Sequence, residues 1–285
     1  MMLAVSKRSV AVVGTAACVT IVFLTSRGIL RGQDARQAGP GAASTKRLEP
    51  QVADNQLDQP LQLAYKARDK FRTIQDYTCV LVKQERIDGE LLPMEYVQMK
   101  ARPRPFSVYL KWLKPYEGRE AIYVAGHNDG KILVHSTGVE KVVGGTVALD
   151  PRGDMAMENS RHVITEAGLG NLIDQLVTRW EAEKKLGQTE AVVKNNAKVD
   201  TRVCWCVKTT HPHDPRRYSY YRSRVFFDKE HGLPIRFEGY DWPRRGSAPD
   251  GDLVEVYTYR DLKFNVALSA ADFSADNPRY NFGRL

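Results

Sequence analysis

Three strand-like segments occupy residues 76–112, which read DYTCVLVKQERIDGELLPMEYVQMKARPRPFSVYLKW. The first, residues 76–87, is rich in β-branched and aromatic residues and ends at Asp88-Gly89, a dipeptide typical of a tight hairpin turn. Its expected partner is residues 91–102. The third segment, residues 106–112, alternates apolar and polar side chains. The stretch therefore predicts consecutive antiparallel strands.

The rest of the chain adds strands and two helices. Apolar residues recur at spacings of three and four over residues 60–74 and 166–185, which predicts two amphipathic helices, the first with Asp58 as its N-cap. Further strands are expected at AIYVAG (121–126), KILVHS (131–136), RVCWCVKTT (202–210), SRVFFD (223–228), LPIRFEGYD (233–241) and LVEVYTYRDLKF (253–264).

These elements predict an α+β fold. Strands that follow one another as hairpins, without alternating helices, form an antiparallel sheet. A sheet of eight or more strands curls instead of staying flat. We therefore expect a strongly curved antiparallel sheet, an incomplete β-barrel, with the two main helices packed in its concave face.

The net charge of the 285-residue chain is +8, from 42 Lys+Arg against 34 Asp+Glu. Most of it lies at the N-terminus, because residues 1–47 contain one acid, Asp34, and seven basic residues. Residues 48–285 carry only +2, which gives no footprint for a phosphate backbone, so nucleic acid is not an expected partner. The seven basic residues are Lys7, Arg8, Arg27, Arg31, Arg36, Lys46 and Arg47.

An export signal is expected in residues 1–30. Residues 10–24, VAVVGTAACVTIVFL, form an apolar run with basic residues on both sides. Its length suits a signal peptide, whereas the lack of a clean A-x-A cleavage site leaves an uncleaved signal-anchor open. Residues 31–57 read as a flexible tether and residues 58–285 as a single domain. The protein is therefore expected to be exported, either periplasmic or anchored to the membrane by its N-terminal segment.

The sequence offers no catalytic, cofactor or metal motif. The serine-hydrolase elbow, zinc-protease, P-loop and dinucleotide signatures are absent, so no catalytic residue, cofactor or metal is predicted. His211-Pro212-His213-Asp214 is the most metal-like cluster, but its prolines place it in a turn, where solvated His and Asp are ordinary. A catalytic site assembled from distant residues stays an alternative.

Three cysteines follow the export segment, all in expected strands. Cys204 and Cys206 lie on the same side of one strand and are not expected to pair with each other. An oxidising compartment allows a disulfide from Cys79 to Cys204 or Cys206 if their strands are neighbours. The alternative is three buried free thiols.

Two longer stretches resemble a bacterial family of uncharacterised proteins, domain of unknown function 1571. These are residues 76–124 and the pair 225–243 and 255–273, which together bracket about residues 60–282. The second stretch also resembles LolA-type lipoprotein carriers, through Asp228 at a strand end, Leu233-Pro234, the Tyr-rich strand and Asp272-Phe273.

The resemblance implies an incomplete β-barrel whose helices close an apolar interior. By alternation, we expect its pocket face to include Val108, Leu110, Trp112, Trp205, Val207, Ile235 and Phe237. The implied function is a non-enzymatic envelope protein that binds an acyl chain, a lipid or a lipidated partner. Two alternatives remain: a scaffolding domain without a small ligand, and an enzyme with a non-local site.

Overall fold

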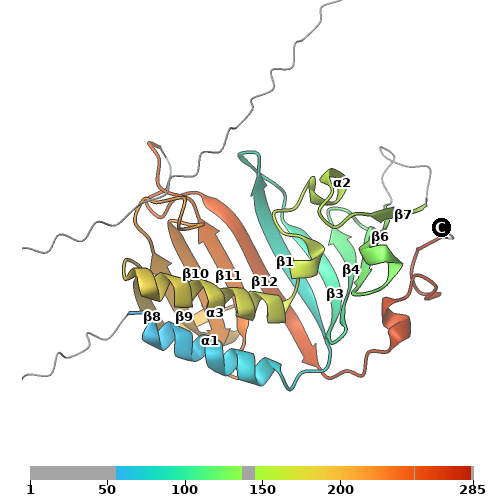
Figure 1. Ribbon diagram of the computed structural model, residues 1–285, viewed down its shortest axis with the longest axis horizontal. Coiled ribbons are helices and arrows are strands. Elements are labelled where there is room, and N and C mark those ends of the chain that lie inside the picture. Colours follow the sequence, from blue (N-terminus) through green and yellow to red (C-terminus); the bar gives the residue numbers. More distant parts are fainter. Residues whose placement is uncertain (1–55, 137–144, 247, 284–285) are drawn as a thin grey trace, which may run out of the picture. The chain divides into compact units, whose positions relative to one another are not determined.

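The computed structural model describes residues 56–136, 145–246 and 248–283. Residues 1–55 lie outside it, so the predicted signal segment and nearly all of the predicted tether are not described. The described part is an open antiparallel sheet with helices on one face, shown in Figure 1. The predicted fold class, a curved antiparallel sheet with two main helices, is confirmed.

The sheet has 12 strands in the order β7-β6-β5-β4-β3-β1-β12-β11-β10-β9-β8, and β2 pairs with β1 beside this path. Every recorded strand pair is antiparallel. The strands are β1 (Tyr77–Ile87), β2 (Glu90–Leu91), β3 (Glu95–Pro103), β4 (Phe106–Lys114), β5 (Glu120–Val124), β6 (Ile132–His135), β7 (Thr146–Leu149), β8 (Glu190–Val199), β9 (Arg202–Thr210), β10 (Arg222–Asp228), β11 (Pro234–Tyr240) and β12 (Leu253–Phe264).

Strand β1 lies at the centre of the sheet. It pairs with β3 through the predicted hairpin, in which Asp88 and Gly89 have φ angles of 48° and 87°. On its other side it pairs with β12, so the first and last strands of the domain are neighbours. This pairing places Glu85 directly opposite Glu255.

The two main helices are α1 (Asp58–Phe71) and α3 (Leu169–Leu186). The N-cap of α1 was predicted at Asp58, but it is Leu57, one residue earlier. Asp58 belongs to the first turn, where its negative charge interacts favourably with the helix dipole. Helix α3 begins after Gly168, whose φ of 96° suits glycine, and ends at Gly187 with a φ of 65°. Four short helices complete the described fold: η1 (Asn128–Gly130), α2 (Asp154–Met157), η2 (Ile164–Glu166) and, near the C-terminus, η3 (Ala270–Phe273).

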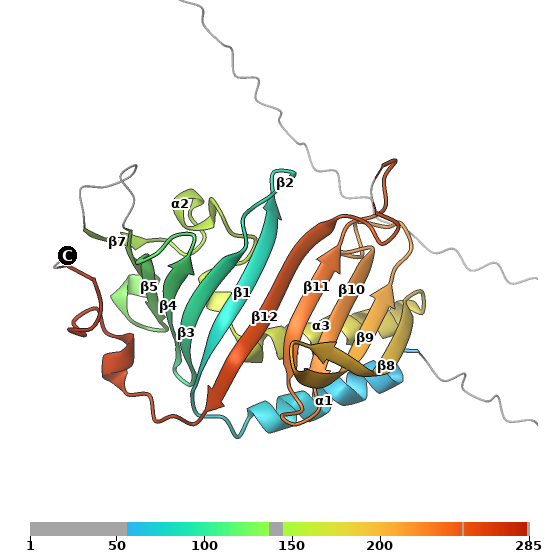
Figure 2. The ribbon, with the colours of Figure 1, turned by 180° about the vertical axis from the view of Figure 1, so that it is seen from behind.

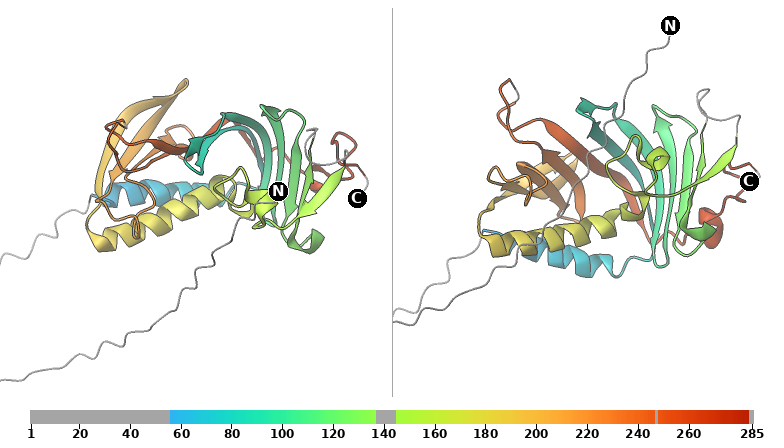
Figure 3. Two further views of the ribbon diagram at one scale, coloured as in Figure 1. Left: turned by 90° about the horizontal axis from the view of Figure 1, so that it is seen from above. Right: turned by 45° about the horizontal axis from the view of Figure 1, so that its top comes forward.

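The main core lies between the helices and the concave face of the sheet. Figure 3 shows the sheet curving around α1 and α3. Trp180 of α3 is 1% exposed, and its ring centroid lies 6.3 Å from that of Phe227 on β10. The helices cover mainly β8–β12, whereas the segment from α2 to η2 faces the other half of the sheet.

The C-terminal segment packs on the opposite face, visible from behind in Figure 2. Phe273 joins a small cluster with Tyr109, Ile122 and Val124, and the ring of Tyr280 stacks on Tyr109 at 4.0 Å. None of the helices in the described part of the chain has the length and apolar character needed to cross a membrane.

Candidate functional site

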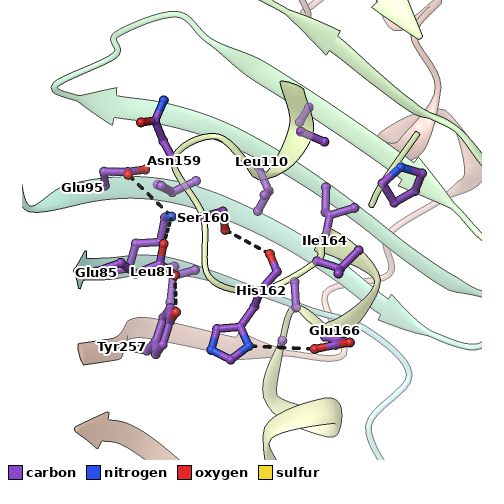
Figure 4. A pocket seen from close by; sticks show the side chains of 18 of the residues that line it. Leu81, Glu85, Glu95, Leu110, Asn159, Ser160, His162, Ile164, Glu166 and Tyr257 are labelled. Atoms are coloured by element: carbon purple, nitrogen blue, oxygen red, sulfur yellow. Dashed lines mark hydrogen bonds and ion pairs between the residues drawn. The ribbon is translucent and has the colours of Figure 1, made fainter. Parts of the chain in front are cut away.

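A cavity of about 310 Å³ lies between the concave face of the sheet and the segment that runs from β7 to α3. Its back wall comes from β1 and β3–β7 with part of β11 and β12, and its front wall from residues 151–176. Figure 4 shows this space from close by. Since the helices leave this half of the sheet uncovered, its inward-facing side chains line a space instead of a packed core.

Most of the cavity wall is apolar. Its apolar residues come from ten helices and strands and include Leu81, Val97, Leu110, Trp112, Ala121, Ile132, Val134, Val147, Leu149, Met155, Ala156, Ile164, Leu172, Leu176 and Phe237. A concave space with mainly apolar walls and few convergent polar groups is the usual form of a small-molecule site.

Charged side chains gather at one end of the cavity. Glu85 and Glu95 lie on neighbouring strands, and the ammonium of Lys83 is 3.2 Å and 3.5 Å from their carboxylates. The indole Nε1 of Trp112 donates to Glu95 at 2.5 Å, and the hydroxyl of Tyr257 donates to Glu85. Figure 4 shows Glu85, Glu95 and Tyr257 together at this end.

Glu255 is the most buried carboxylate of the group, with 1% of its surface exposed. It accepts hydrogen bonds from the Tyr220 hydroxyl at 2.5 Å and Arg161 Nε at 3.0 Å, and His162 Nε2 lies 2.9 Å from it. Like charges opposite each other destabilise a strand pair, so Glu85 and Glu255 require these partners. Arg161 and His162 therefore hold the front wall of the cavity to the sheet.

Three pKa shifts follow from this arrangement. Burial alone would lower the pKa of His162, but its hydrogen bond with Glu255 and the charges of Glu255, Glu85 and Glu166 raise it above the ordinary 6.5. Burial would raise the pKa of Glu255, but His162, Tyr220 and Arg161 lower it below the ordinary 4.5. Burial and Glu255 also raise the pKa of Tyr220. The shifts of His162 and Glu255 both favour the state in which His162 is protonated and Glu255 is ionised.

The His162–Glu255 contact should stabilise the protein most between pH 4.5 and pH 6.5. The raised pKa of His162 gives stability that is complete below 6.5 and is lost as the pH rises through the folded-state value. The lowered pKa of Glu255 gives stability that is complete above 4.5 and is lost as the pH falls. Melting temperatures of the protein and His162→Gln, measured across this range, should differ most inside the window. If the difference in melting temperature between the two proteins instead grew above neutral pH, it would contradict a stabilising ion pair between His162 and Glu255.

A family match covers most of the described domain. Residues 74–282 match the family described as "Protein of unknown function (DUF1571)". The chain belongs to the DUF1571 family. No curated protein matches it.

Solved structures similar to this DUF1571 protein include lipoprotein LppX from Mycobacterium tuberculosis, at 14% identity and a TM-score of 0.43, covering 74% of this chain and 98% of that one. Others are a DUF1329 family protein from Desulfovibrio piger (15%, TM-score 0.38, 77% and 98%) and a LolA superfamily protein from Nitrosomonas europaea (12%, TM-score 0.31, 75% and 96%). At these identities the likeness concerns the fold.

Three of the seven residues expected on the pocket face line the cavity of this DUF1571 domain: Leu110, Trp112 and Phe237. Val108 and Val207 are fully buried in the main core, and Trp205 is partly buried against it. Val207 and Trp205 lie on β9, in the half of the sheet that the helices cover.

Ile235 lies elsewhere, in a cluster with Val199 and Cys204 apart from the main core. A β-bulge explains this: the register between β10 and β11 shifts after Phe226, so that Phe226 faces Arg236 whereas Phe227 faces Pro234. The extra residue interrupts the strict alternation of side chains, and Ile235 does not share the face of Phe237.

The disulfide expected from Cys79 is not formed, and all three cysteines in the described chain are buried and free. Cys79 lies on β1 and Cys204 and Cys206 on β9, with three strands between them. Cys79 also belongs to the main core, whereas Cys204 belongs to the cluster around Ile235. The neighbouring strands that the pairing requires are therefore absent from this sheet order.

His211 is buried, in contrast to the solvated turn expected from its flanking prolines. It is 5% exposed, its Nε2 lies 3.1 Å from Glu183 of α3, and its ring stacks on Tyr218 at 4.6 Å. The residue therefore ties the loop after β9 to the end of α3. Within residues 56–136, 145–246 and 248–283, no three His, Cys, Asp or Glu side chains gather as a metal site.

The sequence patterns did not predict the charged end of the cavity. Lys83 and Glu85 occupy the inward positions of β1 that follow Cys79 and Leu81 in the alternation. Polar residues at apolar positions of a strand were the available signal. Their partners Arg161 and His162 lie in an irregular segment, whose contacts no periodic pattern predicts.

Proposed function

We propose that the protein is a non-enzymatic binding protein of the cell envelope, whose cavity holds an acyl chain of a lipid or of a lipidated partner. The observation that carries the proposal is the apolar cavity with charged residues at one end. Such a cavity suits a ligand with a long apolar part and a polar end. The fold positions it by leaving one half of the curved sheet free of long helices.

Apolar burial alone could supply useful affinity. Each CH₂ group moved from water into an apolar site contributes about 0.8 kcal/mol, so a ten-carbon stretch contributes roughly 8 kcal/mol before the entropy costs of binding. A polar anchor is therefore not required. The charged end of the cavity would instead set the orientation of the bound acyl chain.

The buried charges favour binding over catalysis. Glu255 is fully engaged by Tyr220, Arg161 and His162, and Glu85 by Lys83 and Tyr257. The lowered pKa of Glu255 and the raised pKa of Tyr220 both move away from neutrality, whereas a general acid or base works best near it. The pKa of His162 is raised from 6.5 toward neutrality, but its Nε2 lies 2.9 Å from Glu255 and is engaged in the same cluster. The cluster therefore fits the role of fastening the front wall.

The location in the envelope rests on the N-terminal sequence. The apolar run of residues 10–24 and its flanking basic residues are typical of export. We keep residues 1–30 as a signal peptide or signal-anchor, residues 31–57 as a tether and residues 58–285 as the binding domain. Fractionation of cells that make the full chain would test this, and a cytoplasmic protein would contradict it.

Filling the cavity should abolish ligand binding without unfolding the protein. Ala156 of α2 lines the cavity, whereas Ala148 of β7 lies between the lining residues Val147 and Leu149 and points outward. We expect the Ala156→Trp variant to carry no bound lipid, because the indole occupies the apolar space. Its affinity for a fluorescent fatty-acid probe should fall by roughly tenfold or more. Ala148→Trp is the matched control and should bind normally.

The measurement is mass spectrometry of lipid extracted from the full-length protein after purification from cells, combined with titration of the probe. A stoichiometric acyl species that Ala156→Trp lacks and Ala148→Trp keeps supports the proposal. Its chemical class distinguishes a free lipid from the acyl chain of a lipidated protein. A protein that carries no lipid and does not bind the probe would contradict the proposal and favour the scaffolding alternative.

A further inference from the structure

Arg179 of α3 is a cation on the wall of the apolar cavity. Within residues 56–136, 145–246 and 248–283, no group forms an ion pair or a hydrogen bond with its guanidinium. The guanidinium lies over the ring of Tyr220, with Cζ 5.2 Å from the ring centroid. Because Tyr220 lines the same cavity, this contact places the positive charge at the cavity wall.

The ring beneath Arg179 is fixed in position. Tyr220 is 4% exposed, and its hydroxyl donates to Glu255 at 2.5 Å. Stacking on an aromatic ring uses the flat face of a guanidinium and leaves the N–H groups at its edge available to an acceptor. Arg179 is therefore held at the wall with its hydrogen-bond donors unused.

The carboxylates at the charged end of the cavity do not neutralise Arg179, because they contact other cations. Glu255, the carboxylate beside Tyr220, contacts Arg161 at 3.0 Å and His162 at 2.9 Å. The other two carboxylates of the charged end share one ammonium group. Arg179 thus stays available to an anion that comes from outside the protein.

Gln175 supplies a second donor beside Arg179. It lies one helical turn earlier on α3 and also lines the cavity, and none of the described residues forms a hydrogen bond with its amide. Side chains four residues apart are neighbours on a helix surface. A guanidinium binds two oxygens of a carboxylate or a phosphate at once, and the amide of Gln175 offers further N–H donors. The pair therefore suits an oxyanion.

The apolar wall extends from this end across six successive strands of the sheet. The strands β1, β3, β4, β5, β6 and β7 each contribute an apolar side chain, namely Leu81, Val97, Leu110, Ala121, Ile132 and Val147. Neighbouring strands lie roughly 4.8 Å apart. A ligand with its headgroup at Arg179 could therefore lay a long acyl chain across the strands toward β7.

We infer that this cavity selects an amphiphile whose headgroup is an oxyanion, either the carboxylate of a fatty acid or the phosphate of a lipid, bound by Arg179 and Gln175. The inference rests on the proposed function and adds the chemistry of the polar end of the ligand. The acyl chains of a lipidated protein are joined through esters or amides and carry no such charge. A free anionic amphiphile is therefore the preferred ligand.

The test compares three ligands that share one chain length: hexadecanoate, hexadecyl phosphate and uncharged hexadecanol. Each displaces the uncharged fluorescent probe phenylnaphthylamine from the full-length protein. We expect the two anions to bind roughly tenfold or more tightly than hexadecanol, because only they form charge-assisted hydrogen bonds with Arg179. Arg179→Gln should abolish this preference and still bind hexadecanol normally, since the apolar wall is intact.

A second variant neutralises Arg179 without removing it. In Gln175→Glu, the new carboxylate lies four residues before Arg179, a spacing that forms an ion pair and supports the helix. This variant should fold and also lose the preference for the anions. Lys185→Gln is the matched control, because Lys185 is an exposed cation of α3 that does not line the cavity. It should keep the preference.

Each outcome of the displacement experiment decides the inference. Stronger binding of hexadecanoate identifies a carboxylate headgroup and stronger binding of hexadecyl phosphate a phosphate headgroup, and both support it. Equal binding of the anions and hexadecanol would overturn it but leave the proposed function standing. Failure of all three ligands to displace the probe would overturn both. Arg119 also lines the cavity, and loss of the preference in Arg119→Gln but not in Arg179→Gln would overturn the assignment to Arg179.

Discussion

Replacing Trp180 with alanine is expected to lower the free energy of unfolding by about 3–5 kcal/mol, the usual cost of truncating a large buried aromatic residue. Trp180 is 1% exposed and is among the largest fully buried side chains of the described chain. It lies on the face of α3 that packs on the sheet, with its ring 6.3 Å from Phe227. The cavity left by alanine cannot collapse easily, because strands on one side and a helix on the other hold its walls.

The unfolding midpoint in urea measures this effect. Leu186→Ala is the matched control, because Leu186 is on the same helix but 40% exposed, and a surface change of this kind moves stability by about 0.5 kcal/mol or less. Equal midpoints for the two variants would mean that the contact of Trp180 with the sheet does not anchor α3. A circular dichroism spectrum of each variant separates destabilisation from misfolding.

The fold could be predicted because local sequence patterns indicate its helices and strands. The spacing of apolar residues gave both long helices to within a few residues, and Asp88-Gly89 marked the first hairpin. The N-cap of α1 was misplaced by one residue, since the chain uses Leu57 there without any side-chain hydrogen bond. Such a cap has no sequence signature.

The pocket could be predicted only in part, because alternation alone does not tell which half of a sheet is covered. Leu110 and Trp205 both face inward on strands, but only Leu110 lies where the helices leave space. The bulge in β11 then moved Ile235 off the expected face. Bulges and helix placement depend on packing between segments far apart in sequence.

The charged end depends on one long-range register. Glu85 and Glu255 are 170 positions apart, and the pairing of β1 with β12 places them opposite each other. The sequence of neither strand predicts this register by itself. A slip of one residue in the pairing would move a glutamate to the other face of the sheet. For this reason, no local sequence pattern predicts the charged end of the cavity.

Replacing Glu255 with glutamine is expected to cost about 3–5 kcal/mol, the usual effect of removing one partner of a buried ion pair. Glu255 is 1% exposed and contacts Tyr220, Arg161 and His162. The amide keeps the shape of the side chain but loses its charge, and its NH₂ group faces donors. Arg161 and His162 then lose the carboxylate that holds them to the sheet.

Glu238→Gln is the matched control for this change. Glu238 is also buried in the sheet, 7% exposed, and contacts Arg236 at 2.7 Å and the Tyr240 hydroxyl at 2.8 Å. It follows Phe237 on β11 and so faces away from the cavity that Phe237 lines. The control should also lose stability, but it should leave the front wall of the cavity in place.

Limited trypsin digestion separates the two variants, because Arg161 is itself a cleavage point in the front wall. We expect Glu255→Gln to be cut after Arg161 at least tenfold faster than the unchanged protein, since docking through Glu255 is worth more than the roughly 1.4 kcal/mol that a tenfold change represents. Glu238→Gln should be cut there at the unchanged rate under native conditions. Equal acceleration in both variants would mean that cleavage reports global unfolding, and that the front wall does not depend on Glu255. Selective acceleration would instead identify one carboxylate on the last strand as the group that closes the cavity.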